Sequence, residues 1–113
     1  MKLQVAVRPE AEDELIELWR ASKHRGVVAA AWNDIEAALR SIPTQAGRPV
    51  DFGNLDEALT VQILHRLVAL NLTKDNSVWV MTRHPLRAYY TIHPDDQWIR
   101  VWLIRSSALP TTP

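Results

Sequence analysis

The first third of the chain changes from an alternating to a helical pattern of apolar residues. Residues 2–8, KLQVAVR, alternate apolar and polar side chains, which predicts a short amphipathic strand. From Pro9 onward the apolar residues recur at helical spacing behind a first turn rich in carboxylates. This pattern predicts a helix over 9–24, with Trp19 on its buried stripe.

A second apolar stripe predicts another helix over 27–42, which Pro43 ends. Gly26 suits the residue just after the first helix, so the two helices are expected to form an antiparallel hairpin. The segment TQAGRPVDFGN that follows is typical of a loop. We expect the hairpin to pack on a sheet through Leu15, Trp19, Trp32, Ile35 and Leu39.

The pattern of residues 54–72 fits either a helix or a strand. Its leucines and isoleucines recur at helical spacing, and Asn54 with Glu57 has the spacing of a capping box. Several of the same residues are β-branched or suit a strand. We predict an added helix over 55–70 rather than a strand.

The last third of the chain is rich in aromatic and β-branched residues, which predicts strands over 78–82, 86–92 and 98–104. The segments KDNS and HPDD are expected turns, and the tail 108–113 is expected to be frayed. The element order predicts an α+β domain over 1–107. In it, an N-terminal strand and a helical hairpin pack on a small, mainly antiparallel sheet, with an extra helix inserted around 55–70.

The composition narrows the classes of protein to which this chain can belong. A chain of 113 residues fits one domain, and the absence of cysteine excludes disulfides and thiolate chemistry. The N-terminus lacks the apolar stretch of a signal peptide, and the longest apolar tract is too short and too polar to span a bilayer. The cytoplasm is the expected location. The formal net charge is zero, which does not demand a nucleic-acid partner.

Four pieces in a fixed order, VAVRPEAEDELIEL, ALRSIP, LRAYYTI and IRVWLIR, resemble the RelE/ParE family of toxins from type II toxin–antitoxin pairs. The resemblance covers the chain except for about 50–75, which looks like an insertion. It implies a toxin that is neutralised by a cognate antitoxin and needs no cofactor. The implied target is translation, through ribosome-dependent mRNA cleavage, or DNA gyrase, and only the first would make the chain an enzyme. The resemblance also allows a homodimer.

The resemblance also assigns candidate catalytic residues. Arg87 lies where the family's functional strand carries an arginine, and a guanidinium there suits a scissile phosphate. Arg105 ends the last strand, Arg83 could join it, and His84 is a candidate general base. The alternatives are an Arg87 that faces solvent or pairs with Asp95 or Asp96, and a His84 that only forms a turn before Pro85.

The strand pattern further suggests residues that bind a target or partner. Strict alternation along LRAYYTI places Tyr90 in the core and Tyr89 on the surface, where its ring could stack on a base. The alternative for Tyr89 is cross-strand packing with Trp98 or Trp102. The other candidates for this role are Arg100, Trp98 and Trp102. The alternative function is a non-catalytic module that docks a protein or small apolar ligand in a pocket lined by Trp79, Trp98 and Trp102. The spacing of the four histidines matches no metal motif, so no metal site is expected.

Overall fold

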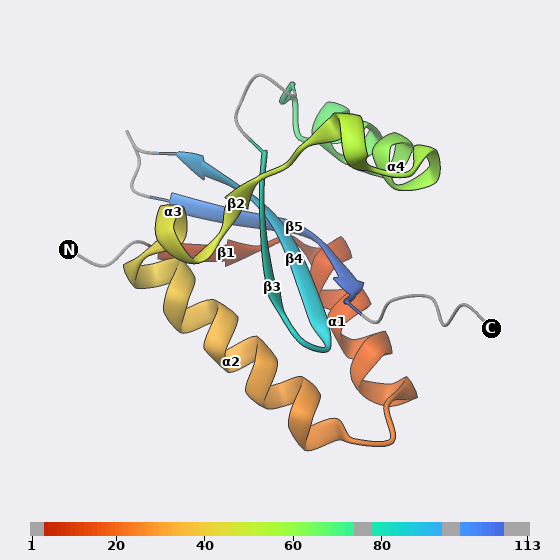
Figure 1. Ribbon diagram of the computed structural model, residues 1–113, viewed down its shortest axis with the longest axis vertical. Coiled ribbons are helices and arrows are strands. Elements are labelled where there is room, and N and C mark those ends of the chain that lie inside the picture. The colour runs from red at the N-terminus through yellow and green to blue at the C-terminus, as the bar shows by residue number, and fades with distance from the viewer. Residues whose placement is uncertain (1–3, 74–77, 94–97, 108–113) are drawn as a thin grey trace.

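The computed structural model describes residues 4–73, 78–93 and 98–107 (Figure 1). The helices and strands alternate less regularly than in a parallel α/β protein, because the strands cluster at the C-terminal end of the chain. In chain order they are β1 (Gln4–Val7), α1 (Pro9–Ala21), α2 (Arg25–Ser41), α3 (Pro43–Ala46), β2 (Arg48–Pro49), the 3-10 turn η1 (Phe52–Asn54), α4 (Glu57–Ala69), β3 (Val78–Arg83), β4 (Leu86–His93) and β5 (Trp98–Ser106).

The strands form one five-stranded mixed sheet in the order β1-β5-β4-β3-β2. Strand β1 runs parallel to β5, and the other neighbours are antiparallel. The predicted α+β class and the three predicted C-terminal strands are therefore confirmed. The N-terminal strand inserts beside the last strand, which joins the two ends of the described chain in one sheet.

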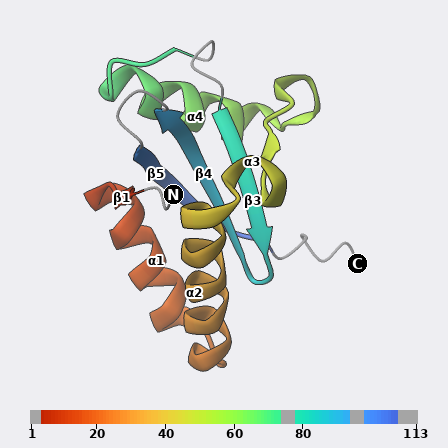
Figure 2. The same cartoon turned by 90° about the vertical axis from the view of Figure 1, so that its left-hand side faces the viewer.

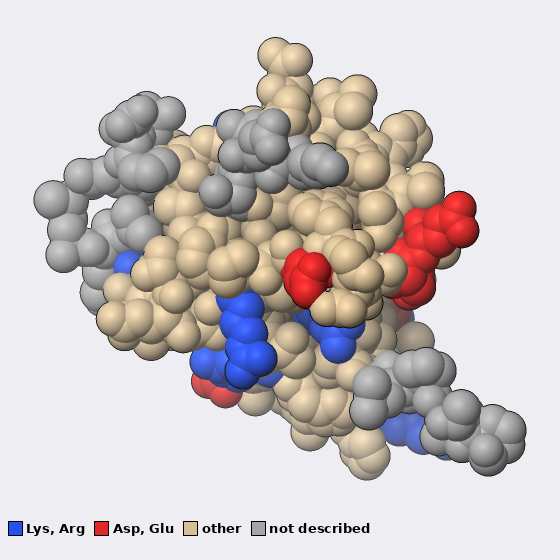
Figure 3. Space-filling model, turned by 45° about the horizontal axis from the view of Figure 1, so that its top comes forward, with Lys and Arg blue, Asp and Glu red and all other residues tan. Residues whose placement is uncertain are grey.

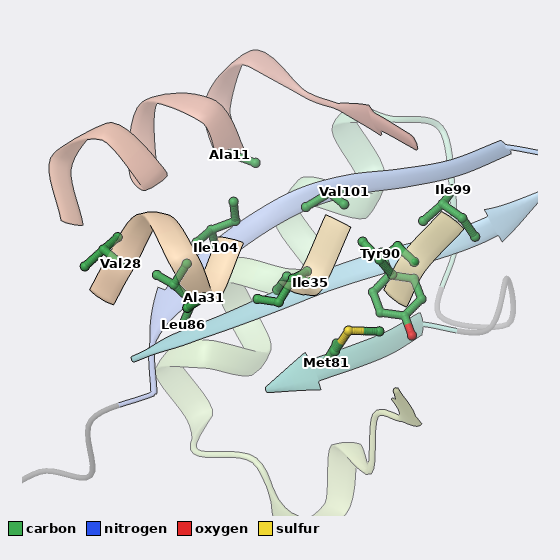
Figure 4. Packing of buried hydrophobic residues seen from close by; sticks show 12 residues of the cluster. Ala11, Val28, Ala31, Ile35, Met81, Leu86, Tyr90, Ile99, Val101 and Ile104 are labelled. Carbon is green, nitrogen blue, oxygen red and sulfur yellow. The ribbon is translucent and has the colours of Figure 1, made fainter. Parts of the chain in front are cut away.

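Helices α1 and α2 cover one face of this sheet (Figure 2). Buried side chains of α2, among them Ile35, meet Met81, Leu86 and Val101 of the strands (Figure 4). We call this side the hairpin face. The prediction that the helical hairpin packs on the sheet is confirmed, with Ile35 and Leu39 fully buried and Leu15 and Trp32 partly buried at the cluster's margin.

Helix α4 covers the opposite face, which we call the α4 face. Ile63 and Leu67 of the helix pack with Tyr89, Trp102 and Leu103 of the sheet in a second buried cluster. The predicted inserted helix is thus confirmed, and its position makes a three-layer arrangement of hairpin, sheet and single helix. Among the described residues no helix is long and apolar enough to cross a membrane.

Several local predictions about helix ends are wrong. Helix α1 ends at Ala21, and Gly26 lies inside α2, so the break between the helices is at 22–24 instead of Gly26. The N-cap of α4 is Asp56, whose carboxylate accepts a hydrogen bond from the Leu59 backbone N–H at 2.7 Å. Asn54 belongs to the 3-10 turn before it. A carboxylate nearer the helix start satisfies the free N–H groups that Asn54 was expected to cap.

The prediction that Trp19 lies in the core is also wrong. Its side chain is 40% exposed at the end of α1, and the guanidinium of Arg25 lies 4.6 Å from the ring centroid. The predicted loop after α2 contains two short elements, α3 and β2. The predicted turn KDNS and most of the predicted turn HPDD lie outside the described residues, as does the tail 108–113.

Candidate functional site

One cross-strand row on the α4 face brings two of the predicted arginines together. In the sheet register Thr82 of β3 lies opposite Arg87 of β4, and Arg87 lies opposite Arg105 of β5. Directly paired residues of antiparallel strands project to the same face of the sheet, so the three side chains form one row. Arg83 is the next residue along β3, so the predicted arginines 83, 87 and 105 gather at one end of the sheet.

Of the two arginines in this row, Arg87 makes the fewer polar side-chain contacts with described residues. Its side chain is partly buried, and it makes no ion pair or hydrogen bond with any residue that the structure describes. Asp95 and Asp96, its predicted alternative partners, lie outside the described residues. The register nevertheless places Arg87 at the end of β4 away from the connection to β5. A partly buried guanidinium without a carboxylate keeps its full capacity to bind an anion.

Arg105, by contrast, is held by residues from two helices. Its guanidinium donates to a carboxylate oxygen of Glu14 on α1, and to the side-chain carbonyl oxygen of Gln62 on α4 at 2.8 Å. Glu14 also accepts two hydrogen bonds from Arg66 of α4, at 3.0 and 3.1 Å. In this Glu14–Arg66–Arg105 network one carboxylate serves two guanidinium groups, so the charge of Arg105 is partly offset inside the protein.

The network closes an open edge of the sheet. Strand β1 pairs with β5 only as far as Val101, beyond which the edge of β5 has no neighbouring strand among the described residues. There the Trp102 carbonyl accepts from Arg66 at 2.7 Å, and the Ile104 N–H donates to Glu14 at 3.3 Å. Side chains thereby satisfy backbone groups that a strand would otherwise pair. Glu14, Gln62 and Arg66 were not predicted, since their spacing in sequence carries no signal of this contact.

The predicted surface position of Tyr89 is wrong. Tyr89 and Trp102 are each only 1% exposed beneath α4, with ring centroids 6.4 Å apart. Neither ring can stack on a base while α4 is in place. Trp98 is 42% exposed, but Trp79 packs on the hairpin face, so the three strand tryptophans do not line a common pocket. A small apolar ligand therefore has no shared aromatic site at these residues.

The remaining candidates occupy two separate places. His84 lies in the β3–β4 turn, with its Nδ1 3.2 Å from the Ser107 hydroxyl, at the same end of the sheet as Arg87. The Arg83 guanidinium donates to the Thr82 carbonyl at 2.9 Å. Arg100 lies farther back along β5, opposite Thr91 and beside β1. The basic end of the sheet thus contains Arg83, His84, Arg87 and Arg105, and excludes Arg100 and Trp98.

Comparison with known proteins connects this arrangement to a known fold. No protein-family model matches the chain, and no curated protein matches it in sequence. A chain of the crystal structure of the toxin–antitoxin complex RelBE2 from Mycobacterium tuberculosis superposes with a TM-score of 0.62, over 96% of this chain and 95% of that one, at 14% sequence identity. The chain has a RelE-like fold.

On the face of this RelE-like fold that Figure 3 shows, the charges are dispersed. Figure 3 shows separate blue and red side chains set in an otherwise uncharged surface rather than one continuous basic field. A strongly steering potential toward nucleic acid requires clustered charge of one sign, and this surface lacks it in that view.

Proposed function

We propose that this chain is the toxin of a toxin–antitoxin pair, held inactive by a cognate antitoxin, and that it acts through the basic end of the sheet around Arg87. The observation that carries the proposal is that Arg87 pairs with no carboxylate of the described residues, on a RelE-like fold that superposes over nearly the whole chain with part of a toxin–antitoxin complex. Its target is either the translating ribosome with mRNA or DNA gyrase.

The chemistry of Arg87 suits both targets. A guanidinium binds a phosphate or a carboxylate through two parallel hydrogen bonds, and it stabilises negative charge that develops on a phosphate during cleavage. His84 lies in the β3–β4 turn at the same end of the sheet, and an imidazole is a suitable general base. If the target is RNA, these two groups would do the chemistry. If it is gyrase, Arg87 would contact an acidic surface and no proton transfer would be needed.

The first experiment is induced expression in bacteria with growth recorded, with and without the gene next to this one. We expect the wild-type chain to arrest growth and the neighbouring gene to restore it. Arg87→Ala should abolish the arrest, because Arg87 makes little contact in the core and its loss leaves the fold intact. Arg40→Ala, which removes an exposed arginine of α2, is the matched control and should arrest growth fully. Full arrest by Arg87→Ala would remove Arg87 from the mechanism.

A second measurement separates the two targets. Cells arrested by the wild-type chain should show either a halt in protein synthesis with new mRNA ends, or a halt in DNA replication with loss of supercoiling activity in a purified gyrase assay. His84→Gln distinguishes them further, since it should weaken mRNA cleavage but leave gyrase inhibition intact. Growth arrest with neither readout would exclude both targets.

A further inference from the structure

A hollow of about 350 Å³ lies where strand β2 begins beside β3. It is lined by Ala46, Arg48, Val80, Thr82 and Arg83. Arg48, the first residue of β2, pairs with Val80 of β3, and Pro49 pairs with Trp79. The part of β3 that holds Thr82 and Arg83 therefore extends past its pairing with β2, which lies beside β3 at the edge of the sheet (Figure 1).

The charge of this hollow differs from that of its neighbours. Its lining contains two arginines and no carboxylate. A second hollow, beneath α4, also contains two arginines, but Glu10 lines it and Glu14 already binds its Arg66. A third, beside α1, is lined by Asp13, Glu14 and Glu17 as well as Arg105. Only the β2–β3 hollow among these three combines a formal charge of +2 with no resident acid.

The donors of this hollow are partly fixed in position. The Arg83 guanidinium is anchored by its bond to the Thr82 carbonyl at 2.9 Å, which leaves its remaining N–H groups free to bind a ligand. The Thr82 side chain is exposed and adds a hydroxyl. Arg48 is exposed and makes no ion pair with a described residue. Two guanidinium groups and a hydroxyl around one hollow are the donor set that a tetrahedral oxyanion needs.

The hollow is continuous with the row that contains Arg87. Residues paired across the strands project to the same face, so Arg48 shares a face with Val80 and Thr82 shares a face with Arg87. Successive strands lie about 4.8 Å apart, so positions on β2 and β4 are separated by roughly 10 Å across the sheet. Arg87 therefore lies directly opposite Thr82, and Arg48 lies diagonally across from Thr82 on the other neighbouring strand, opposite Val80.

We propose that Arg48, Thr82 and Arg83 form a phosphate-binding subsite at the β2–β3 edge. The subsite extends the Arg87 surface, so its biological role rests on the function proposed above. The bound phosphate is either one group of a single-stranded nucleic-acid backbone or a free phosphate, and the donors do not distinguish these sources. Arg48 is the residue that distinguishes this subsite from the Arg87 row, because it lies on the short strand β2 within the segment predicted to be a loop.

The test measures binding of two probes to the purified full chain. A fluorescent single-stranded RNA is titrated at several salt concentrations, and inorganic phosphate is titrated by isothermal calorimetry and as a competitor of the RNA. Arg48→Gln should weaken RNA binding at least fivefold at low salt, and should reduce the slope of log affinity against log salt by about 0.7, the contribution of one phosphate contact on a single strand. Arg48→Lys should retain the slope but lose part of the affinity, because it keeps the charge without the planar fork.

Two further variants complete the design. Thr82→Val should weaken binding less than Arg48→Gln, since it removes one neutral hydroxyl. Arg40→Gln removes an equal charge from α2 and should leave both affinity and salt slope unchanged. A defect with RNA alone identifies a nucleic-acid backbone as the source, and a defect with inorganic phosphate alone identifies free phosphate. If neither probe binds, or if Arg48→Gln behaves as Arg40→Gln with both, the subsite does not exist. Growth arrest by the wild-type chain would still support the toxin role in that case.

Discussion

The hairpin face of the sheet is closed by a large apolar cluster, whereas the α4 face combines a smaller apolar cluster with charged side chains. On the hairpin face, α2 contributes four fully or nearly fully buried apolar side chains, and α1 contributes Ala11. On the α4 face, only Ile63 and Leu67 of the helix are buried. Leu59 of α4 packs partly buried against this cluster, and Arg66 and Gln62 add polar contacts with Glu14 and Arg105.

The two kinds of contact have different consequences for motion. Apolar packing at high density strongly favours one arrangement, since any separation exposes surface to water. Charged contacts near the surface can be exchanged for contacts with water or with a ligand at lower cost. Helix α4 also exposes Val61 at 58% and Val68 at 73%, so both of its sides are apolar. We infer that α4 is the element most easily separated from the sheet, and that its separation would uncover Tyr89, Trp102 and Arg105.

Paired truncations on the two faces give the largest expected effects. Leu39→Ala on α2 should lower the free energy of unfolding by about 3 to 4 kcal/mol, because Leu39 is fully buried and a cavity remains. Leu67→Ala on α4 should cost about 2 to 3 kcal/mol in the same way, but its effect should be concentrated in α4.

Hydrogen exchange measured residue by residue separates the two outcomes. In Leu67→Ala the amides of α4 should exchange faster, while those of β4 and α2 keep most of their protection. Leu64→Ala, at a position 39% exposed, serves as the control for loss of a leucine from the same helix. Equal loss of protection over the whole described chain in Leu67→Ala would show that α4 unfolds together with the sheet, and the contrast between the faces would be lost.

The same contrast explains where sequence reasoning succeeded. The helical hairpin, the three C-terminal strands and the inserted helix were all predictable, because each has a long periodic pattern or a run of β-branched and aromatic residues. The position of Tyr89 was not. Alternation between core and solvent holds for a sheet with one covered face, but β4 is buried on both faces and carries Tyr89 toward α4 and Tyr90 toward the hairpin.

The partners of the charged residues could not be predicted either. Glu14 and Arg105 are separated by 91 positions in the chain, and nothing in the local sequence of either specifies the other. Asp56 could have been recognised as the cap of α4, since it lies three residues before the N–H that it binds. Trp19 was misplaced because its helical spacing matches the buried stripe, although it lies in the last turn of α1, where the hairpin ends.

Glu14→Gln should have the next largest effect. The carboxylate lies between two guanidinium groups and is 17% exposed, while Arg66 and Arg105 are 27% and 33% exposed. Loss of its charge leaves two arginines facing each other, which in a fully buried pair costs about 3 to 5 kcal/mol. Because these side chains are partly hydrated, we expect about 2 kcal/mol, measured by chemical denaturation.

The matched control for Glu14→Gln is Glu17→Gln on the same helix, whose partner Arg20 is exposed. It should change stability by less than about 0.5 kcal/mol. If the two variants are equally stable, the Glu14–Arg66–Arg105 network does not hold α4. A Glu14→Gln chain that binds the phosphate probes more tightly than wild type would show, in addition, that freeing Arg105 adds a cation to the row with Arg87.

Tyr90 on the hairpin face gives the smallest effect on stability at neutral pH and a distinctive dependence at high pH. Its hydroxyl donates a hydrogen bond to the Pro43 carbonyl at 2.6 Å, and a side chain larger than hydrogen at Gly47 would collide with it. Tyr90→Phe should cost about 1 kcal/mol at pH 7, the net value of one buried hydrogen bond.

Burial raises the pKa of Tyr90 from 10.0 to about 12, so the unfolded chain loses this proton at lower pH than the folded one. The contribution of the protonated Tyr90 to the free energy of unfolding is therefore complete below pH 10. This contribution is lost as the pH rises from 10 to about 12, by about 2 to 3 kcal/mol in total. Thermal denaturation across this range should show the decline in the wild-type chain and a shallower one in Tyr90→Phe. Parallel curves for the two chains would place the high-pH loss in other groups and would remove the proposed contribution of Tyr90. A steeper decline for the wild-type chain than for Tyr90→Phe would establish that burial under the hairpin holds the tyrosine neutral.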